Sequence, residues 1–432
     1  MLDHPVLFLT ALLLFLFGLV SRLSGRSFVT GPMFFMVVGI LLSPLGFNIF
    51  EFQYEAPAIR MIAEVALIII LFIEASKIHI SHLGKTLSGI PARLLLIGLP
   101  LTMALGTAVA WVMFPSINIW LIALFALILS PTDAALAQAV VKNENIPARI
   151  RESISIESGL NDGIALPVVL FLASAASAAQ QSSTGEWLAF AAGQLILGPI
   201  VGAAIGFCGA RALDVAAERE WSTTAFQGIG VISVALLAFV VAELVGGNGF
   251  IAAFIGGMVF GNSVRHPCTF LFEFMATEGE LLVLITFLVL GAVMLPDALQ
   301  HLNWTWVLYA TLSLTLVRMI PIGLSLLGTG IRLPSYLFLG WFGPRGLASI
   351  LFALLILEDA ELVHGHELLS VTIITVVLSA LLHGITAAPL AKAYGKMTRE
   401  LGDCEEHRPT EEHPLRDGPP ETMRRKLANS RR

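Results

Sequence analysis

Long apolar stretches separated by short polar segments run along most of the chain. Leu7–Val20 and Leu281–Leu295, for example, contain no charged residue. A helix needs about 20 predominantly apolar residues to cross the hydrocarbon core of a bilayer. The pattern therefore predicts an all-α polytopic membrane protein with about thirteen transmembrane helices.

The composition agrees with a membrane protein, because only 13% of the residues are charged and 56% are hydrophobic. A soluble domain usually carries about 25% charged residues. The apolar pattern predicts spans at 5–21, 31–47, 57–74, 90–114, 117–142, 149–177, 186–212, 222–245, 249–263, 277–296, 304–328, 334–357 and 367–394. The fifth and twelfth spans are interrupted by polar and helix-breaking residues.

Lysine and arginine residues are concentrated in one set of alternate loops, as the positive-inside rule requires of cytoplasmic loops. The opposite set holds only Arg60. The rich set holds Arg22, Arg26, Lys77, Lys85, Arg93, Lys142, Arg149, Arg151, Arg211, Arg219, Arg265 and Arg332. We therefore expect a multi-pass protein of the cell (inner) membrane, with its N-terminus outside and its C-terminus in the cytoplasm. Arg318 and Arg345 remain within the bilayer.

Other kinds of chemistry are not indicated. Cys208, Cys268 and Cys404 lie far apart and form no CxxC pair, so we expect neither a disulfide nor a metal cluster. The sequence has no phosphate-binding loop, and we expect no cofactor, no nucleic-acid partner and no enzymatic activity. Residues 397–432 are rich in Glu, Arg, Pro and His, which predicts a disordered cytoplasmic tail.

Two spans carry a proline at matching positions. The breaks read Ser130-Pro-Thr-Asp133 and Gly343-Pro-Arg-Gly346, and the two prolines are 213 residues apart. Proline removes a backbone donor and clashes with the preceding turn, so both helices should unwind there. An offset of seven spans inverts the second copy relative to the first. Paired broken helices in inverted repeats are typical of a transporter's substrate site.

The sixth span carries two carboxylates, Glu157 and Asp162, in a segment that also contains Ser158 and Asn161. A central Asp costs roughly 2.5–3.5 kcal/mol on membrane-insertion scales, so such residues are expected to be functional. Helical spacing places Ser158 and Asp162 on one stripe, which suggests a hydroxyl and a carboxylate facing the same ion.

The break in the fifth span adds Thr132 and Asp133, and unwinding there frees backbone carbonyls. Hard oxygen ligands of this kind suit Na⁺. Either side chain could instead cap the second half of the helix, and both interpretations remain open. In the other break, Arg345 needs a negative partner if it is buried, and we expect Glu157 to be that partner.

Three further charged residues lie in or near spans. Glu74 ends the third span, where it could line an access funnel, touch the core site or lie solvated at the interface. Glu243 and Arg318 are expected in structural ion pairs or near helix ends.

These residues together resemble the NhaP/NHE branch of monovalent cation/proton antiporters. The stretches that carry the resemblance are Ser130-Pro-Thr-Asp133, Glu157-Ser-Gly-Leu-Asn-Asp162, Gly249-Phe-Ile-Ala-Ala-Phe through Gly261-Asn262, and Gly343-Pro-Arg-Gly346. The resemblance covers about residues 5–395. One departure is that Asp133 is followed by Ala134, where relatives usually have proline, so the resemblance says less about which ion is selected.

The resemblance implies a role for each site residue. Asp162 would bind the ion, Thr132 and Ser158 would be further Na⁺ ligands, and Asn161 and Asp133 would support them. Glu157 and Arg345 would form the core ion pair, and Glu74 matches the family's acidic residue at the end of the third helix.

The resemblance also implies a homodimer in which a core part moves against a dimerisation part. The antiporter unit would span 1–396, with a dimerisation part at about 5–74 and 222–296, a core part at about 90–177 and 304–394, and a linker helix at about 186–212.

The implied activity is electroneutral exchange of Na⁺ or Li⁺ for H⁺, with both ions competing for Asp162. Burial raises the pKa of a carboxylate and nearby cations lower it, so one group can bind either ion. A K⁺/H⁺ antiporter is the alternative within this class. A sodium-coupled organic-anion symporter and a non-transporting membrane sensor are the alternatives from other classes.

Overall fold

The structure is a computed structural model that describes residues 4–24, 30–49, 57–78, 89–181, 184–265, 280–300, 302–359, 365–400 and 405–407. The regular structure within these ranges is entirely helical, which confirms the predicted all-α class. Each of the thirteen predicted spans overlaps a helix or a chain of consecutive helices. Seven helical stretches are long and apolar enough to cross a membrane, and shorter apolar helices accompany them.

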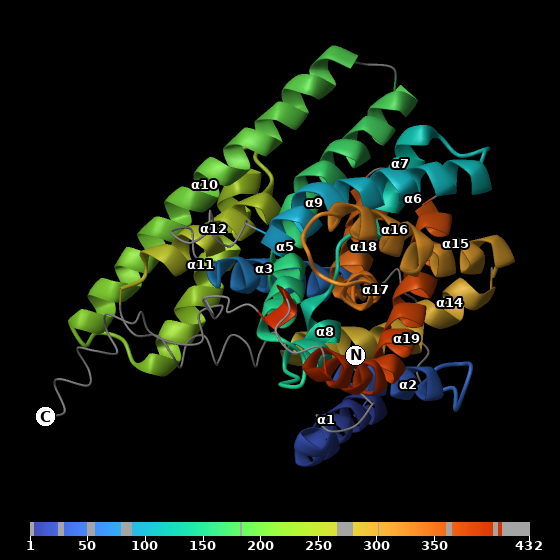
Figure 1. Ribbon diagram of the computed structural model, residues 1–432. Helices are drawn as coiled ribbons and strands as arrows, with labels where there is room; N and C mark the ends of the chain where they lie inside the picture. Colours follow the sequence, from blue (N-terminus) through green and yellow to red (C-terminus); the bar gives the residue numbers. More distant parts are fainter. Residues whose placement is uncertain are drawn as a thin grey trace, which may run out of the picture. The chain divides into compact units, whose positions relative to one another are not determined.

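The elements follow one another along the chain as Figure 1 labels them. They are α1 (His4–Ser24), α2 (Gly31–Leu42), α3 (Pro57–Ser76), α5 (Gly89–Arg93), η2 (Leu94–Gly98), α6 (Leu99–Met113), α7 (Ile119–Ile128), α8 (Ala134–Val141), α9 (Ala148–Gln181), α10 (Thr184–Glu218), α11 (Thr224–Leu244), α12 (Gly249–Ser263), η3 (Leu290–Met294), α14 (Leu295–Gln300), α15 (Trp304–Leu314), α16 (Leu316–Ser325), α17 (Leu333–Trp341), α18 (Leu347–Asp359), α19 (Gly365–Glu400) and η4 (Glu405–His407).

Both predicted interruptions are present, between α7 and α8 and between α17 and α18. Three irregularities were not predicted. η2 and η3 are single π-helical turns, and the chain changes direction between α15 and α16 at Thr315, whose φ and ψ are −111° and −95°.

The chain divides into two compact units. Unit 1 draws on Met1–Met61, Gly89–Asn161 and Val283–Thr410, and unit 2 on Ile62–Ser88, Asp162–Leu282 and Glu411–Arg432. α9 is one continuous helix whose first part belongs to unit 1 and whose second part belongs to unit 2. The predicted core and dimerisation parts are defined by what each part does during transport, whereas these two units are defined by compactness. The predicted division stays a prediction.

Unit 2 is built on close contacts between glycines and helix backbones. α10, α11 and α12 pack side by side. A Cβ at Gly202 would overlap the backbone of Ala252, and one at Gly206 would overlap the backbone of Gly256. On the other side of α12, Gly257 meets the backbone of Phe72 in α3. Small residues allow the close van der Waals contact that holds helices together in lipid, where burial of apolar surface contributes little.

Matching caps support the internal repeat. Thr30 accepts a hydrogen bond from the backbone N–H of Met33 and caps α2. Asn248 accepts one from the N–H of Ile251, 3.0 Å away, and caps α12. These are the equivalent positions when Gly31 is aligned with Gly249.

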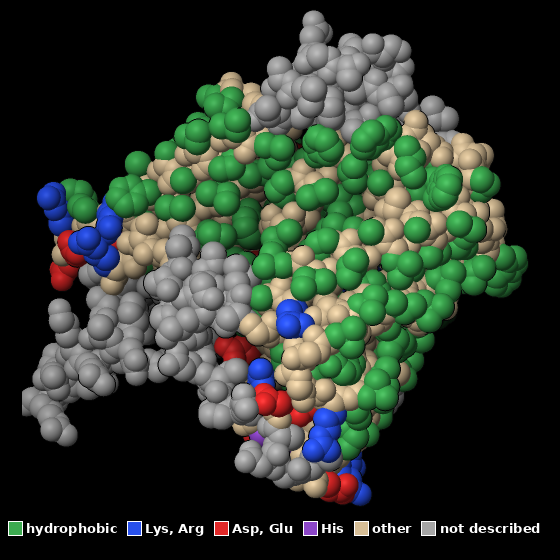
Figure 2. All heavy atoms as spheres, turned by 45° about the horizontal axis from the view of Figure 1, so that its top comes forward, with side chains coloured by type: hydrophobic (Ala, Val, Ile, Leu, Met, Phe, Trp, Pro, Cys, Tyr) green, Lys and Arg blue, Asp and Glu red, His purple; other side chains and the backbone are tan. Residues whose placement is uncertain are grey.

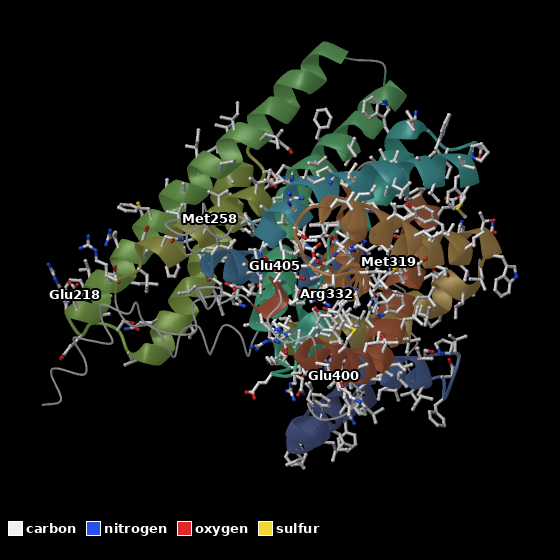
Figure 3. The ribbon with its side chains drawn as sticks, viewed as in Figure 1. Glu218, Met258, Met319, Arg332, Glu400 and Glu405 are labelled. Atoms are coloured by element: carbon white, nitrogen blue, oxygen red, sulfur yellow. The ribbon has the colours of Figure 1, made fainter. Side chains whose placement is uncertain are left out.

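The C-terminal part of unit 1 corrects the predicted tail. α19 continues to Glu400, beyond the boundary predicted at Lys396, and Glu405–His407 form a short turn. Figure 3 labels Glu405 close to Arg332. The remainder of the predicted tail, residues 408–432, lies outside the described residues.

Two acidic side chains explain why this turn is ordered. The Glu406 carboxylate is buried and accepts from the Arg332 backbone N–H at 2.8 Å and from the Ser335 hydroxyl at 2.7 Å. Glu405 pairs with Arg149, the two groups being 3.0 Å apart. Composition suggested a solvated tail, and it did not reveal that these acids meet the first turns of α9 and α17.

Hydrophobic side chains lie on the outer faces of the helices, as Figure 2 shows for one side of the molecule. Large exposed examples are Phe15, Leu19, Trp111, Val112, Trp304 and Leu244. A soluble protein rarely exposes so much contiguous apolar surface, so these faces are suited to lipid.

Gly202→Ala should destabilise unit 2, because the added Cβ would overlap the Ala252 backbone. Overpacking of this kind typically costs about 1–3 kcal/mol, and we expect a lower melting temperature for the purified protein in detergent. Gly193→Ala, in the same helix with open space around it, is the matched control. A Gly202→Ala protein that melts with or above the control would contradict this packing.

Glu406→Ala should loosen the C-terminal turn, because the Arg332 N–H and the Ser335 hydroxyl would both lose an acceptor. An unmet buried hydrogen bond costs about 1–3 kcal/mol. We expect faster limited proteolysis after α19 and a lower melting temperature. Glu400→Ala removes an exposed carboxylate 3.9 Å from Lys396 and should change neither value. Equal proteolysis of the two variants would show that the turn does not depend on Glu406.

Candidate cation-binding site

The two helix breaks lie against each other within unit 1. Helix α7 ends before Pro131, and α18 begins after Pro344, because proline cannot donate the backbone hydrogen bond that would continue a helix. The N–H of Asp133 donates to the Pro344 carbonyl at 2.8 Å. The Ser349 hydroxyl donates to the Ile128 carbonyl at 2.7 Å. Segments more than 200 residues apart in the sequence are thereby joined at their irregular backbone.

Asp133 caps both half-helices that leave the breaks. Its Oδ1 accepts from the Leu136 N–H at 3.1 Å, in the first turn of α8, and its Oδ2 accepts from the Leu347 N–H at 2.8 Å, at the start of α18. A carboxylate at a helix N-terminus also interacts favourably with the helix dipole. Of the two interpretations left open for Asp133, this geometry supports capping.

Gly346 makes room for this double cap. A Cβ built on Gly346 would fall on the Asp133 carboxylate. The glycine of the Gly343-Pro-Arg-Gly346 break is therefore required by a side chain from the other break.

Arg345 is fully buried and binds backbone carbonyls. Its Nη1 donates to the carbonyls of Ser130 and Pro131. These are carbonyls that unwinding frees, and we expected them to be available to Na⁺. That expectation is wrong for Ser130 and Pro131, because a guanidinium group already binds both.

Glu157 forms its ion pair with Arg318. Their nearest charged atoms are 2.6 Å apart, and both side chains are almost completely buried. The prediction that Arg345 is the direct partner of Glu157 is therefore wrong. The physical reason is that Arg345 points to the carbonyls of the other break. Arg318, on α16, packs against Gly343 and pairs with Glu157. The more general expectation of a structural ion pair for Arg318 is confirmed.

Polar side chains of α9 meet the first break at Thr132. The Thr132 and Ser158 hydroxyl oxygens are 3.0 Å apart. The Asn161 amide donates to the Thr132 hydroxyl at 2.7 Å and to the Thr132 carbonyl at 3.0 Å. All three side chains are buried, and Oδ1 of Asn161 makes no hydrogen bond to another described residue. The three predicted residues thus form one cluster of oxygen atoms.

Asp162 follows Asn161 directly on α9 and is half-buried. Residues four apart in a helix lie on the same face, so Asp162 lies one turn beyond Ser158. Within unit 1, the two hydroxyls of Thr132 and Ser158 and the amide oxygen of Asn161 are hard ligands of the kind suited to an alkali cation.

The remaining predicted residues lie in unit 2. Glu74 is half-buried in α3 and pairs with Lys77 at 2.7 Å, one turn away, which fits the interfacial interpretation. Glu243 accepts from the Gly249 N–H at 2.7 Å. It therefore lies at a helix end, as expected.

Comparisons with known proteins show which family and which fold the chain is similar to. The family model described as "Sodium/hydrogen exchanger, transmembrane" matches residues 9–393. The K(+)/H(+) antiporter NhaP of Alkalimonas amylolytica is 25% identical over 385 residues, which cover 88% of this chain and 65% of that protein. The Na(+)/H(+) antiporter NhaH of Halobacillus dabanensis is 26% identical over 291 residues, which cover 63% of this chain and 68% of that protein. The chain spans 65% of the length of the K(+)/H(+) relative.

A solved structure has the same fold. The sodium proton antiporter MjNhaP1 from Methanocaldococcus jannaschii matches with a TM-score of 0.71, covering 89% of this chain and all of that one. The sequence identity is 18%, so the likeness concerns the fold alone.

A double-mutant cycle distinguishes the observed ion pair from the predicted one. Glu157→Ala and Arg318→Ala should each lower the free energy of unfolding by about 3–5 kcal/mol, because each leaves a buried charge without its partner. The coupling energy of Glu157 with Arg318 should exceed that of Glu157 with Arg345. Thermal unfolding in detergent measures all three single and both double variants.

Glu157→Gln and Arg318→Lys provide a milder pair if the alanine variants do not accumulate. Coupling to Arg345 equal to or larger than coupling to Arg318 would contradict the observed pairing.

Proposed function

Because the chain belongs to the transmembrane sodium/hydrogen exchanger family, we propose that it is an antiporter that exchanges Na⁺ or Li⁺ for H⁺ across the cell membrane. The observation that carries the proposal is the oxygen cluster of Thr132, Ser158 and Asn161 at the meeting point of two broken helices. Asp162 adjoins this cluster along α9. We assign Asp162, Ser158 and Thr132 as the ligands of the transported cation, supported by Asn161.

The buried charges favour one-for-one exchange. Arg318 and Arg345 contribute two positive charges, and Glu157 and Asp133 contribute two negative charges. These four charges cancel and stay fixed, because each group is held by the contacts described above. We assign Asp162 as the carboxylate whose charge a single Na⁺ or a single H⁺ neutralises.

Competition for Asp162 then couples the two ions. Moving a bare carboxylate through an apolar barrier costs several kcal/mol, whereas a carboxylate that carries a proton or a cation is neutral. Only the loaded site crosses, so one passage carries Na⁺ in one direction, the return passage carries H⁺ in the other, and a full cycle exchanges one ion for one. Driven by an inward proton gradient, the exchange extrudes Na⁺ and contributes to pH homeostasis.

K⁺/H⁺ exchange is the second candidate. It is favoured by the relatives from Alkalimonas amylolytica and Shewanella oneidensis, both of which are named K(+)/H(+) antiporters. The ligand types are the same for Na⁺ and K⁺, so the two candidates differ in the size of the site.

The assembly and orientation are part of the proposal. We infer a homodimer, with the N-terminus outside and the C-terminus in the cytoplasm. The core part would carry the broken helices, and the dimerisation part would stay fixed in the bilayer. Cation binding by the oxygen cluster depends neither on the dimer nor on the orientation in the membrane.

Transport by proteoliposomes with an acidic lumen tests the function. Adding Na⁺ or Li⁺ should dequench a pH-sensitive dye, and Asp162→Asn should abolish the response. Asp297→Asn, in α14, is the matched control and should retain it. A response to K⁺ alone would establish the second candidate, and no cation response from a folded protein would favour the symporter or sensor alternatives.

A current measurement tests the stoichiometry separately. One-for-one exchange moves no net charge, so a Na⁺ gradient alone should produce no current across a lipid bilayer. A sustained current that Asp162→Asn abolishes would refute one-for-one exchange.

A further inference from the structure

The break between α17 and α18 separates two backbone groups that an unbroken helix would join. In an α-helix, the N–H of each residue donates to the carbonyl four residues before it. Arg345 is four residues after Trp341, but Phe342, Gly343 and Pro344 are not helical. The Arg345 N–H therefore needs another partner in the interior of the protein. The Trp341 carbonyl accepts from the Gly343 N–H at 2.8 Å instead, which leaves one further acceptor position on its oxygen.

Two side chains of α19 bridge this gap. The Arg345 N–H donates to the Ser379 hydroxyl at 2.7 Å. That hydroxyl is 3.2 Å from Nδ1 of His383, and Nε2 of His383 is 2.8 Å from the Trp341 carbonyl. Ser379 and His383 are four residues apart, so one face of α19 presents both. The four groups form a continuous chain from Arg345 to Trp341.

We propose that His383, acting together with Ser379, is a positioning residue that replaces the missing helical hydrogen bond and fixes the backbone of the second break. Both ring nitrogens of His383 take part, Nδ1 beside Ser379 and Nε2 at the Trp341 carbonyl.

The directions of the hydrogen bonds are set by the groups themselves. A carbonyl oxygen can only accept, so Nε2 of His383 carries the proton that Trp341 receives. The Ser379 hydroxyl oxygen accepts from Arg345, and its own proton is then available to Nδ1. The Ser379 carbonyl is also 2.9 Å from Nδ1.

His383 is buried, so water cannot replace the hydrogen bonds of this chain if they are lost. The residue is 2% exposed, and its ring packs on the ring of Trp341 with 5.1 Å between centroids. Buried polar groups that lose their partners are costly because water is not at hand to replace them.

Fixing the Arg345 backbone matters for the proposed ion site. The side chain of Arg345 binds the carbonyls of Ser130 and Pro131, which directly precede Thr132. His383 would therefore act on cation binding through Arg345, without touching the ion. This last step rests on the proposed function, whereas the bridge itself does not.

The test compares His383→Leu, His383→Gln and Ser379→Ala with Thr375→Val as the matched control. Thr375 is buried in the same helix, and its hydroxyl donates only to the Val371 carbonyl of α19. Gln can still donate to the Trp341 carbonyl, whereas Leu cannot. Two measurements are made on each protein: hydrogen–deuterium exchange of the Arg345 amide, and the KM and maximal rate of cation-driven proton release from proteoliposomes.

We expect Ser379→Ala, which removes the direct acceptor of the Arg345 N–H, to speed exchange of that amide about tenfold or more, the effect of one lost buried hydrogen bond. His383→Leu should also speed it, because the Ser379 hydroxyl then loses the partner that holds it in place. The KM for the cation should rise by a similar factor, more than the maximal rate falls. His383→Gln should recover part of both effects, and Thr375→Val should match the wild type. Combining Ser379→Ala with His383→Leu should have less effect than the sum of the two single changes, because residues that act as one unit are not additive.

Amide exchange tests the bridge at the second break, and transport tests the proposed function, so failure of one can be told from failure of the other. Unchanged exchange of the Arg345 amide in His383→Leu would overturn the inference, whatever the transport result. Additive effects of Ser379→Ala and His383→Leu would also overturn it. A wild-type protein that moves no cation would refute the proposed function, and the amide measurement would still decide on the bridge.

Discussion

Inside an apolar medium, a backbone N–H or carbonyl without a partner costs several kcal/mol, and both broken helices create such groups. Unit 1 meets this requirement with side chains. Asp133 receives N–H groups from two helix starts, Arg345 donates to two carbonyls, and Ser379 and His383 join the ends of the second break. Irregular backbone is therefore tolerated here because other parts of the chain supply a partner at each point.

The same contacts constrain the charges. A buried ion pair is weak evidence for stability, because desolvation of both groups can exceed the attraction between them. Glu157 and Arg318 are thus better understood as fixing the neighbourhood of the oxygen cluster than as strengthening the fold. Arg345 and Asp133 are engaged with backbone groups, so neither charge is available for an exchanging ion.

The sequence allowed the membrane class, the spans and both breaks to be predicted, because apolar length and proline act locally. Helical spacing alone did not group Thr132, Ser158 and Asn161; the family resemblance did, and the three side chains are hydrogen-bonded to one another through Thr132. The partner of Glu157 was predicted wrongly, although both arginines had been recognised as intramembrane residues. Arg318 pairs with Glu157 because the Arg345 side chain points to the carbonyls of the other break and because Gly343 leaves room for the Arg318 guanidinium. The spacing of residues along one helix reveals neither fact.

Other features also escaped prediction because they depend on contacts that local sequence does not reveal. The two interpretations of Asp133 could not be separated, because one of the groups it caps, Leu347, is 214 residues away. The π-helical turns contain Gly98 and Gly291 and are followed by Pro100 and Pro296, residues that mark an irregularity without specifying its type. The interruption at Thr315 has neither residue beside it. The turn at Glu405–His407 lies in a segment whose composition indicates disorder, and it is ordered by acceptors that meet particular helix starts.

The double cap by Asp133 has a consequence for the symmetry of the duplicated architecture. With Pro131 aligned to Pro344, Asp133 corresponds to Gly346 and Thr132 corresponds to Arg345. One carboxylate lies where the two copies meet, and it occupies the space that a side chain of the other copy would need. The two breaks therefore cannot both carry a carboxylate at this position, and the two copies of the repeat must differ in sequence there. One contributes the hydroxyl of the oxygen cluster, and the other contributes a permanent positive charge.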